Sequence, residues 1–295
     1  MEPLGQDAAT NSVRGQVAVV TGAGRGIGRA IALALAEAGA WVAVCARSED
    51  QITETAREIV ARDGRALVVP ADVSIRSDVE HLIAQVEQAL GPVDLLVNNA
   101  GRALPVGAIA ETDPDEWWQT MEVNVRGSLY CSRAVLPSML ARGRGRIVNV
   151  SSQAGFLAWP MLSAYAVSKA ALLRLTENLA AETRGRGVQV FAVIPGEVRT
   201  AMTEAALSCG EPSVEQFFQG IFDQGTDVPP ERAADLVVHL ASGQADRLSG
   251  RYVSAVPQLA GVPGERADVR EMVARGAEIA EHGLYLLRPR ELGVG

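Results

Sequence analysis

Short runs of apolar, often β-branched residues alternate with longer helical patterns along most of the chain. The apolar runs occupy residues 16–21, 41–46, 66–70, 93–98, 146–150, 188–194 and 252–255. They lack the polar alternation of a half-exposed strand, so we expect strands that are buried on both faces. The helical patterns occupy residues 26–38, 49–63, 75–90, 115–141, 164–184 and 230–242. This alternation predicts an α/β fold built on a parallel sheet.

No internal repeat or low-complexity linker interrupts the alternation, which predicts one domain over residues 15–256. We expect a Rossmann-like, doubly wound sheet of about seven strands, with helices on both faces and a ligand beyond the carboxyl ends of the strands. Residues 1–14 resemble a disordered leader, since they lack the basic start and apolar core of a signal peptide. Residues 201–228 fall outside the alternation, as does a partly helical C-terminal extension, 257–295, with a charged helical pattern at 265–281.

The composition is that of a soluble globular protein, with 48% hydrophobic and 21% charged residues. A net charge of −8 argues against nucleic-acid and membrane partners. The three cysteines and three histidines are scattered without metal-ligand or redox spacing. We therefore predict no metal site and expect a reducing, cytoplasmic location.

A glycine-rich segment, 21–28, follows the first expected strand and opens the first expected helix. Glycines at this place permit a tight turn and let backbone amides approach a pyrophosphate at the helix N-terminus. The segment predicts a dinucleotide site. Its candidate residues are Gly22, Gly24, Arg25, Gly26, Ile27 and Gly28.

The end of the second expected strand indicates which dinucleotide is bound. An NAD site usually has a carboxylate there, whereas arginine accommodates the 2′-phosphate of NADP. The chain has Arg47 directly after the strand and no acid at its end, with Arg25 in the glycine turn. This pattern favours NADP(H) over NAD(H). The alternative is that both arginines are solvated surface residues.

Tyr165 and Lys169 are four residues apart in an expected helix, and Ser152 lies thirteen residues before the tyrosine. Residues at i and i+4 share a helix face. A nearby ammonium favours the phenolate and should lower the pKa of the tyrosine towards the working range. A serine hydroxyl could bind the oxygen whose proton the tyrosine exchanges. The three residues predict an acid/base site for forming or oxidising an alcohol.

With these motifs in place, the chain resembles the short-chain dehydrogenase/reductase family over residues 15–256. Further matching motifs are Asp72-Val73, Asn98 to Gly101, Asn124, Ser151-Ser152 and residues 195–200. The resemblance implies an adenine contact by Asp72 and Val73 and a cofactor cleft lined by Asn99, Ala100 and Gly101. It also implies a segment closing over the nicotinamide, with Pro195, Gly196, Val198 and Thr200.

The resemblance implies a mechanism as well. Hydride passes between the nicotinamide and a carbonyl carbon while Tyr165 exchanges the proton of the oxygen. Ser152, preferred to Ser151 for its spacing, orients that oxygen. Lys169 holds the nicotinamide ribose, and Asn124 holds a water that connects Lys169 to solvent.

Apolar residues between the serine and the tyrosine, and in 201–228, predict a hydrophobic ketone or alcohol substrate, such as a polyketide, terpenoid, steroid-like ring or acyl chain. The alternative is a lid whose apolar face only packs on the core. Two other functions stay open: an NAD(H)-dependent alcohol dehydrogenase, and a non-redox relative such as an epimerase, dehydratase or dinucleotide sensor. The last expected strand lacks the Gly-Gly that often ends family members. The resemblance implies a homodimer or homotetramer.

Overall fold

A computed structural model describes residues 13–256, and the structural statements below concern these residues. Seven parallel strands form one sheet in the order β3-β2-β1-β4-β5-β6-β7. The strands are β1 (Val17–Thr21), β2 (Trp41–Ala46), β3 (Arg65–Pro70), β4 (Leu95–Asn98), β5 (Gly145–Val150), β6 (Val188–Ile194) and β7 (Tyr252–Ser254). The order reverses between β1 and β4, so the chain winds first one way and then the other. The predicted doubly wound α/β fold is confirmed.

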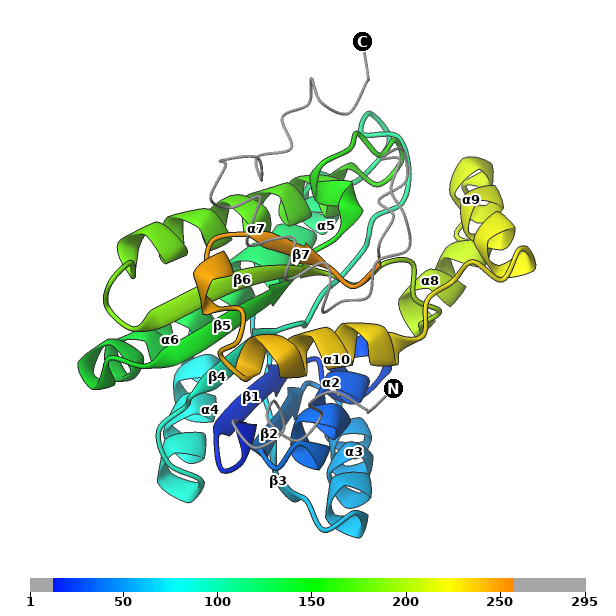
Figure 1. Ribbon diagram of the computed structural model, residues 1–295. Coiled ribbons are helices and arrows are strands. Elements are labelled where there is room, and N and C mark those ends of the chain that lie inside the picture. Colours follow the sequence, from blue (N-terminus) through cyan, green and yellow to red (C-terminus); the bar gives the residue numbers. More distant parts are fainter. Residues whose placement is uncertain (1–12, 257–295) are drawn as a thin grey trace, which may run out of the picture.

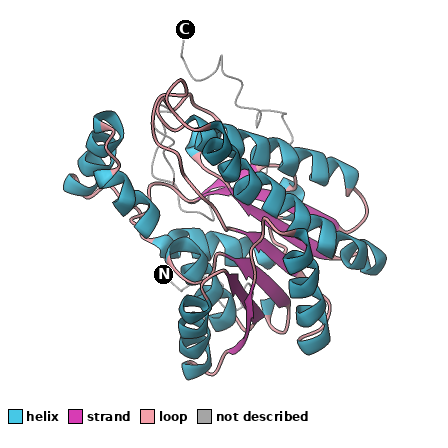
Figure 2. Cartoon of the chain, turned by 180° about the vertical axis from the view of Figure 1, so that it is seen from behind, coloured by secondary structure: helices cyan, strands magenta, loops and turns pink. Residues whose placement is uncertain are grey.

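Helices cover both faces of this sheet (Figures 1 and 2). They are α2 (Gly26–Glu37), α3 (Glu49–Ala61), α4 (Arg76–Ala89), α5 (Pro114–Met121), α6 (Gly127–Arg142), α7 (Ser163–Glu182), α8 (Ala201–Ala205), α9 (Pro212–Asp223) and α10 (Pro230–Ala241). Successive residues of β1 belong to different cores: Ala18 packs with α2, α3 and α10, whereas Val19 packs with α4 and α6. Strands buried on both faces therefore explain the absence of polar alternation.

The helix expected at 115–141 is not continuous. It consists of α5, a π-helical turn at Glu122–Arg126, and α6. Isolated π-helical turns occur mostly within α-helices and frequently at functional sites. This turn carries Asn124, which is buried and bonded to two other segments. The π-helical turn therefore coincides with hydrogen bonds to distant segments, and the local sequence pattern does not predict it.

The described residues include all of the predicted domain, 15–256, and the last two residues of the expected leader. One of these, Val13, is fully buried in the core with α2 and α10, so the packed chain begins before Gly15. Residues 1–12 and the extension 257–295, with its expected helix at 265–281, lie outside the described residues. Within 13–256, no helix is both long and apolar enough to cross a membrane.

Candidate active site

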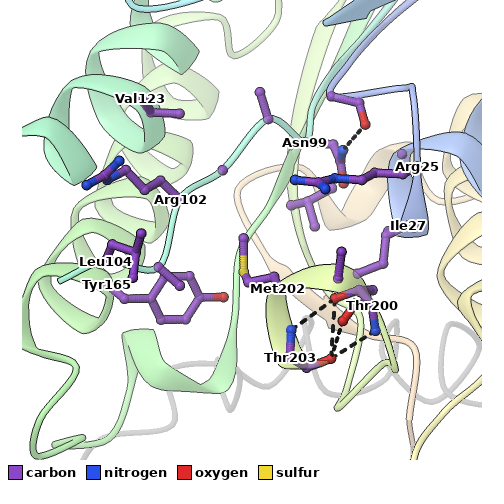
Figure 3. A pocket seen from close by; sticks show the side chains of 18 of the residues that line it. Arg25, Ile27, Asn99, Arg102, Leu104, Val123, Tyr165, Thr200, Met202 and Thr203 are labelled. Carbon is purple, nitrogen blue, oxygen red and sulfur yellow. Dashed lines mark hydrogen bonds between the residues drawn. The ribbon is translucent and has the colours of Figure 1, made fainter. Parts of the chain in front are cut away.

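A cavity of about 800 Å³ opens beyond the carboxyl ends of the strands. The turns after β1, β2, β3, β4, β5 and β6 all contribute to its wall. Ligands of open α/β sheets bind at this edge, where the strand order reverses. Figure 3 shows Arg25 and Ile27 on one side of the cavity and Arg102, Leu104 and Tyr165 on the other.

The glycine turn is packed too closely to admit side chains. A Cβ on Gly28 would lie 2.2 Å from the Gly22 carbonyl oxygen and 2.3 Å from the Asn99 Nδ2. Asn99 donates from that Nδ2 to the carbonyl oxygens of Thr21 (2.9 Å) and Gly22 (3.2 Å). The turn is thus fastened to the loop after β4, and the first amides of α2 face a cavity that suits a pyrophosphate.

Two arginines lie at the dinucleotide end of the cavity, and both are exposed. Arg47 follows β2, and its Nη1 is 3.8 Å from a carboxylate oxygen of Asp72, an exposed and weak ion pair. The other oxygen of Asp72 accepts hydrogen bonds from the amide and hydroxyl of Ser74. Arg25 precedes α2 and makes no cap with its side chain. Both guanidiniums are therefore available to an anionic group.

Ser152, Tyr165 and Lys169 come together on the wall of the same cavity. Ser152 follows β5, and Tyr165 and Lys169 are one turn apart in α7. The Ser152 hydroxyl accepts from the Ala154 amide at 3.2 Å and is close enough to the Tyr165 hydroxyl to affect its pKa. The Lys169 Nζ lies 5.5 Å from the centre of the Tyr165 ring and donates to the Val150 carbonyl oxygen at 2.8 Å. Ser151 instead donates to the backbone of Lys169.

Burial shifts both titratable groups of this trio towards their neutral forms. It raises the pKa of Tyr165, although the nearby Ser152 hydroxyl lowers it; the negative charge of Glu197 raises it further. Burial lowers the pKa of Lys169 to about 8. The pKa of Tyr165 is thus raised rather than lowered as the sequence predicts, with desolvation as the largest cause.

Asn124 connects the loop after β4 to α7 rather than lining the cavity. Its Oδ1 accepts from the Arg102 amide at 2.8 Å, and its Nδ2 donates to the Arg102 carbonyl at 2.9 Å and to the Ser168 hydroxyl at 2.8 Å. A Cβ on Gly101 would lie 3.5 Å from the Asn124 Oδ1 and 3.9 Å from the Lys169 Nζ. The small residue thus leaves space between the two side chains.

Most of the other predicted site residues line the cavity. They are Gly22, Gly24, Arg25, Gly26, Ile27, Gly28, Arg47, Asp72, Val73, Asn99, Ala100, Gly101, Pro195, Gly196 and Thr200. Val198 does not line it: this residue is buried and pairs with Val228 through its backbone. Asn98 is also buried outside the wall, where it bonds Ser132 and Asn149 and so braces β4 against β5 and α6.

The other end of the cavity has an apolar and aromatic wall. Trp159, Leu162, Met202 and Phe218 line it, the last two from α8 and α9. Trp159 packs edge-on against Phe217 with ring centres 5.0 Å apart. Figure 1 shows α8 and α9 extending away from the sheet. The segment 201–228 therefore packs on the loop before α7 rather than on the main core, as the cluster of Leu162, Val214 and Phe218 confirms.

No metal centre is found among residues 13–256, which contain no cluster of three potential ligands. Cys45 and Cys131 are fully buried. Burial raises the pKa of both thiols, that of Cys131 to about 12, so both stay protonated. Protonated, buried thiols are poor metal ligands.

Comparison with known proteins decides the family. The model of the short chain dehydrogenase family matches residues 16–208. The chain belongs to this family. A short chain dehydrogenase of Pseudocercospora fijiensis is 38% identical over 281 residues, which cover 93% of this chain and 89% of that protein. Another short chain dehydrogenase, from Monascus purpureus, is 38% identical over 280 residues, which cover 93% of this chain and 88% of that protein.

Two solved structures of the family share the fold. An actinorhodin polyketide ketoreductase with NADPH has a TM-score of 0.75 and 35% identity, covering 81% of this chain and 95% of that chain. A putative NAD(P) dependent gluconate 5-dehydrogenase from Beutenbergia cavernae with bound NADP has a TM-score of 0.75 and 36% identity, covering 82% and 95%. The chain is accordingly an oxidoreductase that acts on CH–OH or C=O groups with a nicotinamide dinucleotide.

Two polar residues that line the cavity, Glu197 and Arg102, were not selected from the sequence. Gln153, which the sequence places near the reacting carbonyl between the serine and the tyrosine, donates a hydrogen bond to Glu197. Glu197 stands inside the matched motif at 195–200, and its charge at that position was the available signal. Nothing in the local sequence indicated that Gln153 would reach it across 44 positions.

Proposed function

We propose that this short-chain dehydrogenase is an NADP(H)-dependent oxidoreductase that interconverts a ketone and a secondary alcohol on a hydrophobic small molecule. The observation that supports this proposal most is the convergence of Ser152, Tyr165 and Lys169 in one cavity between a glycine cradle and an aromatic wall. An acid/base group, an anion-binding helix end and apolar walls are the parts that such a reaction needs.

The residues around the cavity suit a dinucleotide, because the glycine turn that opens α2 lines it and two exposed arginines lie in the same wall. Gly22 to Gly28 would hold the pyrophosphate, Asp72 and Val73 the adenine, and Gly196 and Thr200 the nicotinamide end. The nicotinamide, when bound, supplies or accepts the hydride. The chain contributes position and proton transfer.

In the reductive direction, Tyr165 donates its proton to the carbonyl oxygen of the substrate, and Ser152 donates a hydrogen bond to the same oxygen. These two donors stabilise the negative charge that develops there. Lys169 would hold the nicotinamide ribose, and a water held by Asn124 would connect Lys169 to solvent and so let a proton return to Tyr165. The net reaction consumes ketone, NADPH and a proton, and it yields alcohol and NADP⁺.

The proposal fails if NADPH is not oxidised in the presence of any member of a panel of apolar ketones. The panel should include linear, monocyclic and bicyclic aromatic ketones, since the walls formed by Trp159 and Phe218 favour flat or extended apolar bodies. Consumption of NADPH that requires both ketone and protein is the expected result.

Preference for NADP(H) is expected to depend on Arg47. Its exposed guanidinium faces the dinucleotide end of the cavity, with no carboxylate at the end of β2. Arg47→Ala should raise the Kd of NADPH by about 10-fold or more, the value of a charge-assisted hydrogen bond, and leave the Kd of NADH nearly unchanged. Titration calorimetry measures both constants.

Arg57→Ala is the matched control, because Arg57 is an exposed arginine in α3 whose partner is Glu54. It should leave both constants unchanged. If the Arg47→Ala protein bound NADPH as tightly as the unaltered protein, Arg47 would not be the residue that binds the 2′-phosphate.

The pH dependence is expected to differ between the two directions. Reduction needs Tyr165 as a phenol, which its raised pKa preserves, and Lys169 as an ammonium, which is lost as the pH rises through about 8. Reduction, measured as kcat/KM, should therefore be constant below this pH and fall above it. Oxidation needs the phenolate and should rise with pH. A reduction rate that rises across the alkaline range would contradict the account.

A further inference from the structure

Glu197 places a carboxylate in the cavity wall close to the candidate acid/base residue. It follows β6, lines the cavity together with Tyr165 and Ser152, and its negative charge is felt by the Tyr165 hydroxyl. The cavity wall is mixed, with Trp159 and Leu162 beside polar residues such as Thr203. Glu197 is the carboxylate of this wall whose charge acts on Tyr165.

The Glu197 carboxylate is held in a fixed direction. Gln153, which is buried in the turn after β5, donates from its Nε2 to the Glu197 Oε1 at 2.9 Å. The Glu197 carbonyl accepts from the Val228 amide at 2.8 Å, which fixes its backbone as well. A side chain locked by its neighbours is suited to recognise a group of defined geometry.

No cation neutralises this carboxylate among the described residues, since no lysine, arginine or histidine nitrogen lies within 4.0 Å of it. Two cationic residues of the cavity wall, Arg102 and Lys169, have other partners. Arg102 pairs with Glu116 at 2.9 Å, and Lys169 donates to the Val150 carbonyl. Glu197 is partly buried, and a partly buried carboxylate without a cation gains when a ligand brings a hydrogen-bond donor.

We propose that Glu197 is a specificity-determining residue that accepts a hydrogen bond from a hydroxyl group of the substrate, beyond the reacting carbonyl. The substrates are then hydrophobic hydroxyketones, and the corresponding diols in the oxidative direction. A hydroxyl is favoured over an ammonium because Lys169 and the oxidised nicotinamide already place positive charge at this end. The inference rests on the proposed function and narrows its substrate class.

The test compares α-tetralone with its monohydroxylated isomers as ligands of the protein loaded with NADP⁺. The ketones cannot be reduced in this complex, so titration calorimetry gives their Kd values without turnover. At least one isomer should bind about 10–100-fold more tightly than α-tetralone, the effect of a hydrogen bond to a charged group. This preference should fall to a few-fold in Glu197→Gln and vanish in Glu197→Ala.

Glu204→Gln is the matched control, because Glu204 is a nearby carboxylate that pairs with Arg199 and is more than half exposed. Its preference for the hydroxylated isomer should equal that of the unaltered protein. The inference is overturned if no isomer binds better than α-tetralone, or if the preference survives in both Glu197 variants.

Turnover separates this inference from the proposed function. If the hydroxyl preference depends on Glu197 but NADPH reduces none of the ketones, the proposed function is wrong and the recognition by Glu197 stands. If the ketones are reduced equally well with and without the hydroxyl, the proposed function stands and the recognition of a hydroxyl by Glu197 is wrong.

Discussion

Replacement of Tyr165 by phenylalanine is expected to slow ketone reduction by a factor of about 10²–10⁴ or more. The substitution removes only the hydroxyl that would protonate the carbonyl oxygen. The ring, which lies beside the Lys169 ammonium and packs with Leu162 and Phe218, is retained. Steady-state kinetics with NADPH and an apolar ketone should show the loss in kcat, because the proton is needed in the transition state.

Tyr130→Phe provides the matched control for this substitution. Tyr130 lies in α6 and packs with the core on the face of α4, away from the cavity. Loss of its hydroxyl should leave the rate of reduction unchanged. Normal turnover by the Tyr165→Phe protein, with its fold and NADPH binding intact, would show that another group provides the proton.

The second large effect is expected from Gly28→Ala. The new Cβ would overlap the Gly22 carbonyl oxygen and the Asn99 amide, at 2.2 and 2.3 Å, so the turn or α2 must shift. Overpacking of this kind costs about 1–3 kcal/mol of folding free energy. The shift also moves the amides that face the pyrophosphate, so we expect NADPH affinity to fall by at least about 10-fold, the loss of one hydrogen bond to a charged group. Chemical denaturation and calorimetry measure the two losses.

Gly220→Ala is the corresponding control, since Gly220 also lies inside a helix and a Cβ there would come no closer than 3.9 Å to its neighbours. It should stabilise α9 by about 0.5–1 kcal/mol, because alanine is the better helix former. NADPH affinity should stay the same. If Gly28→Ala behaved like Gly220→Ala, the glycine would not be needed for the cradle.

The strands were predictable because each is buried on both faces, and burial on both faces leaves an uninterrupted apolar run. The residues of β1 illustrate this, with neighbours that belong to opposite cores. The ends of the strands then carry the motifs, because the carboxyl ends of parallel strands share one edge. The sequence could therefore place Gly28 and Ser152 at a common site, and the spacing from Ser152 adds Tyr165 of α7 to it.

What the sequence could not supply depends on contacts between distant segments. The π-helical turn around Asn124 accompanies hydrogen bonds to Arg102 and Ser168, which lie 22 and 44 positions away. The desolvation of Tyr165, which raises its pKa, likewise arises from packing and not from the spacing to Lys169. The spacing of residues along the sequence predicts which side chains lie close together. Their pKa values depend on how strongly the folded protein desolvates them.

The most direct measurement follows the hydride itself. NADPH that carries deuterium on the transferable position is incubated with the protein and a reducible apolar ketone, and the alcohol is analysed by mass spectrometry and NMR. The account predicts one deuterium on the carbinol carbon, in a single stereochemical configuration, with product formation strongly reduced in Tyr165→Phe. Alcohol without deuterium at that carbon, or no alcohol from any ketone with NADPH bound, would contradict it.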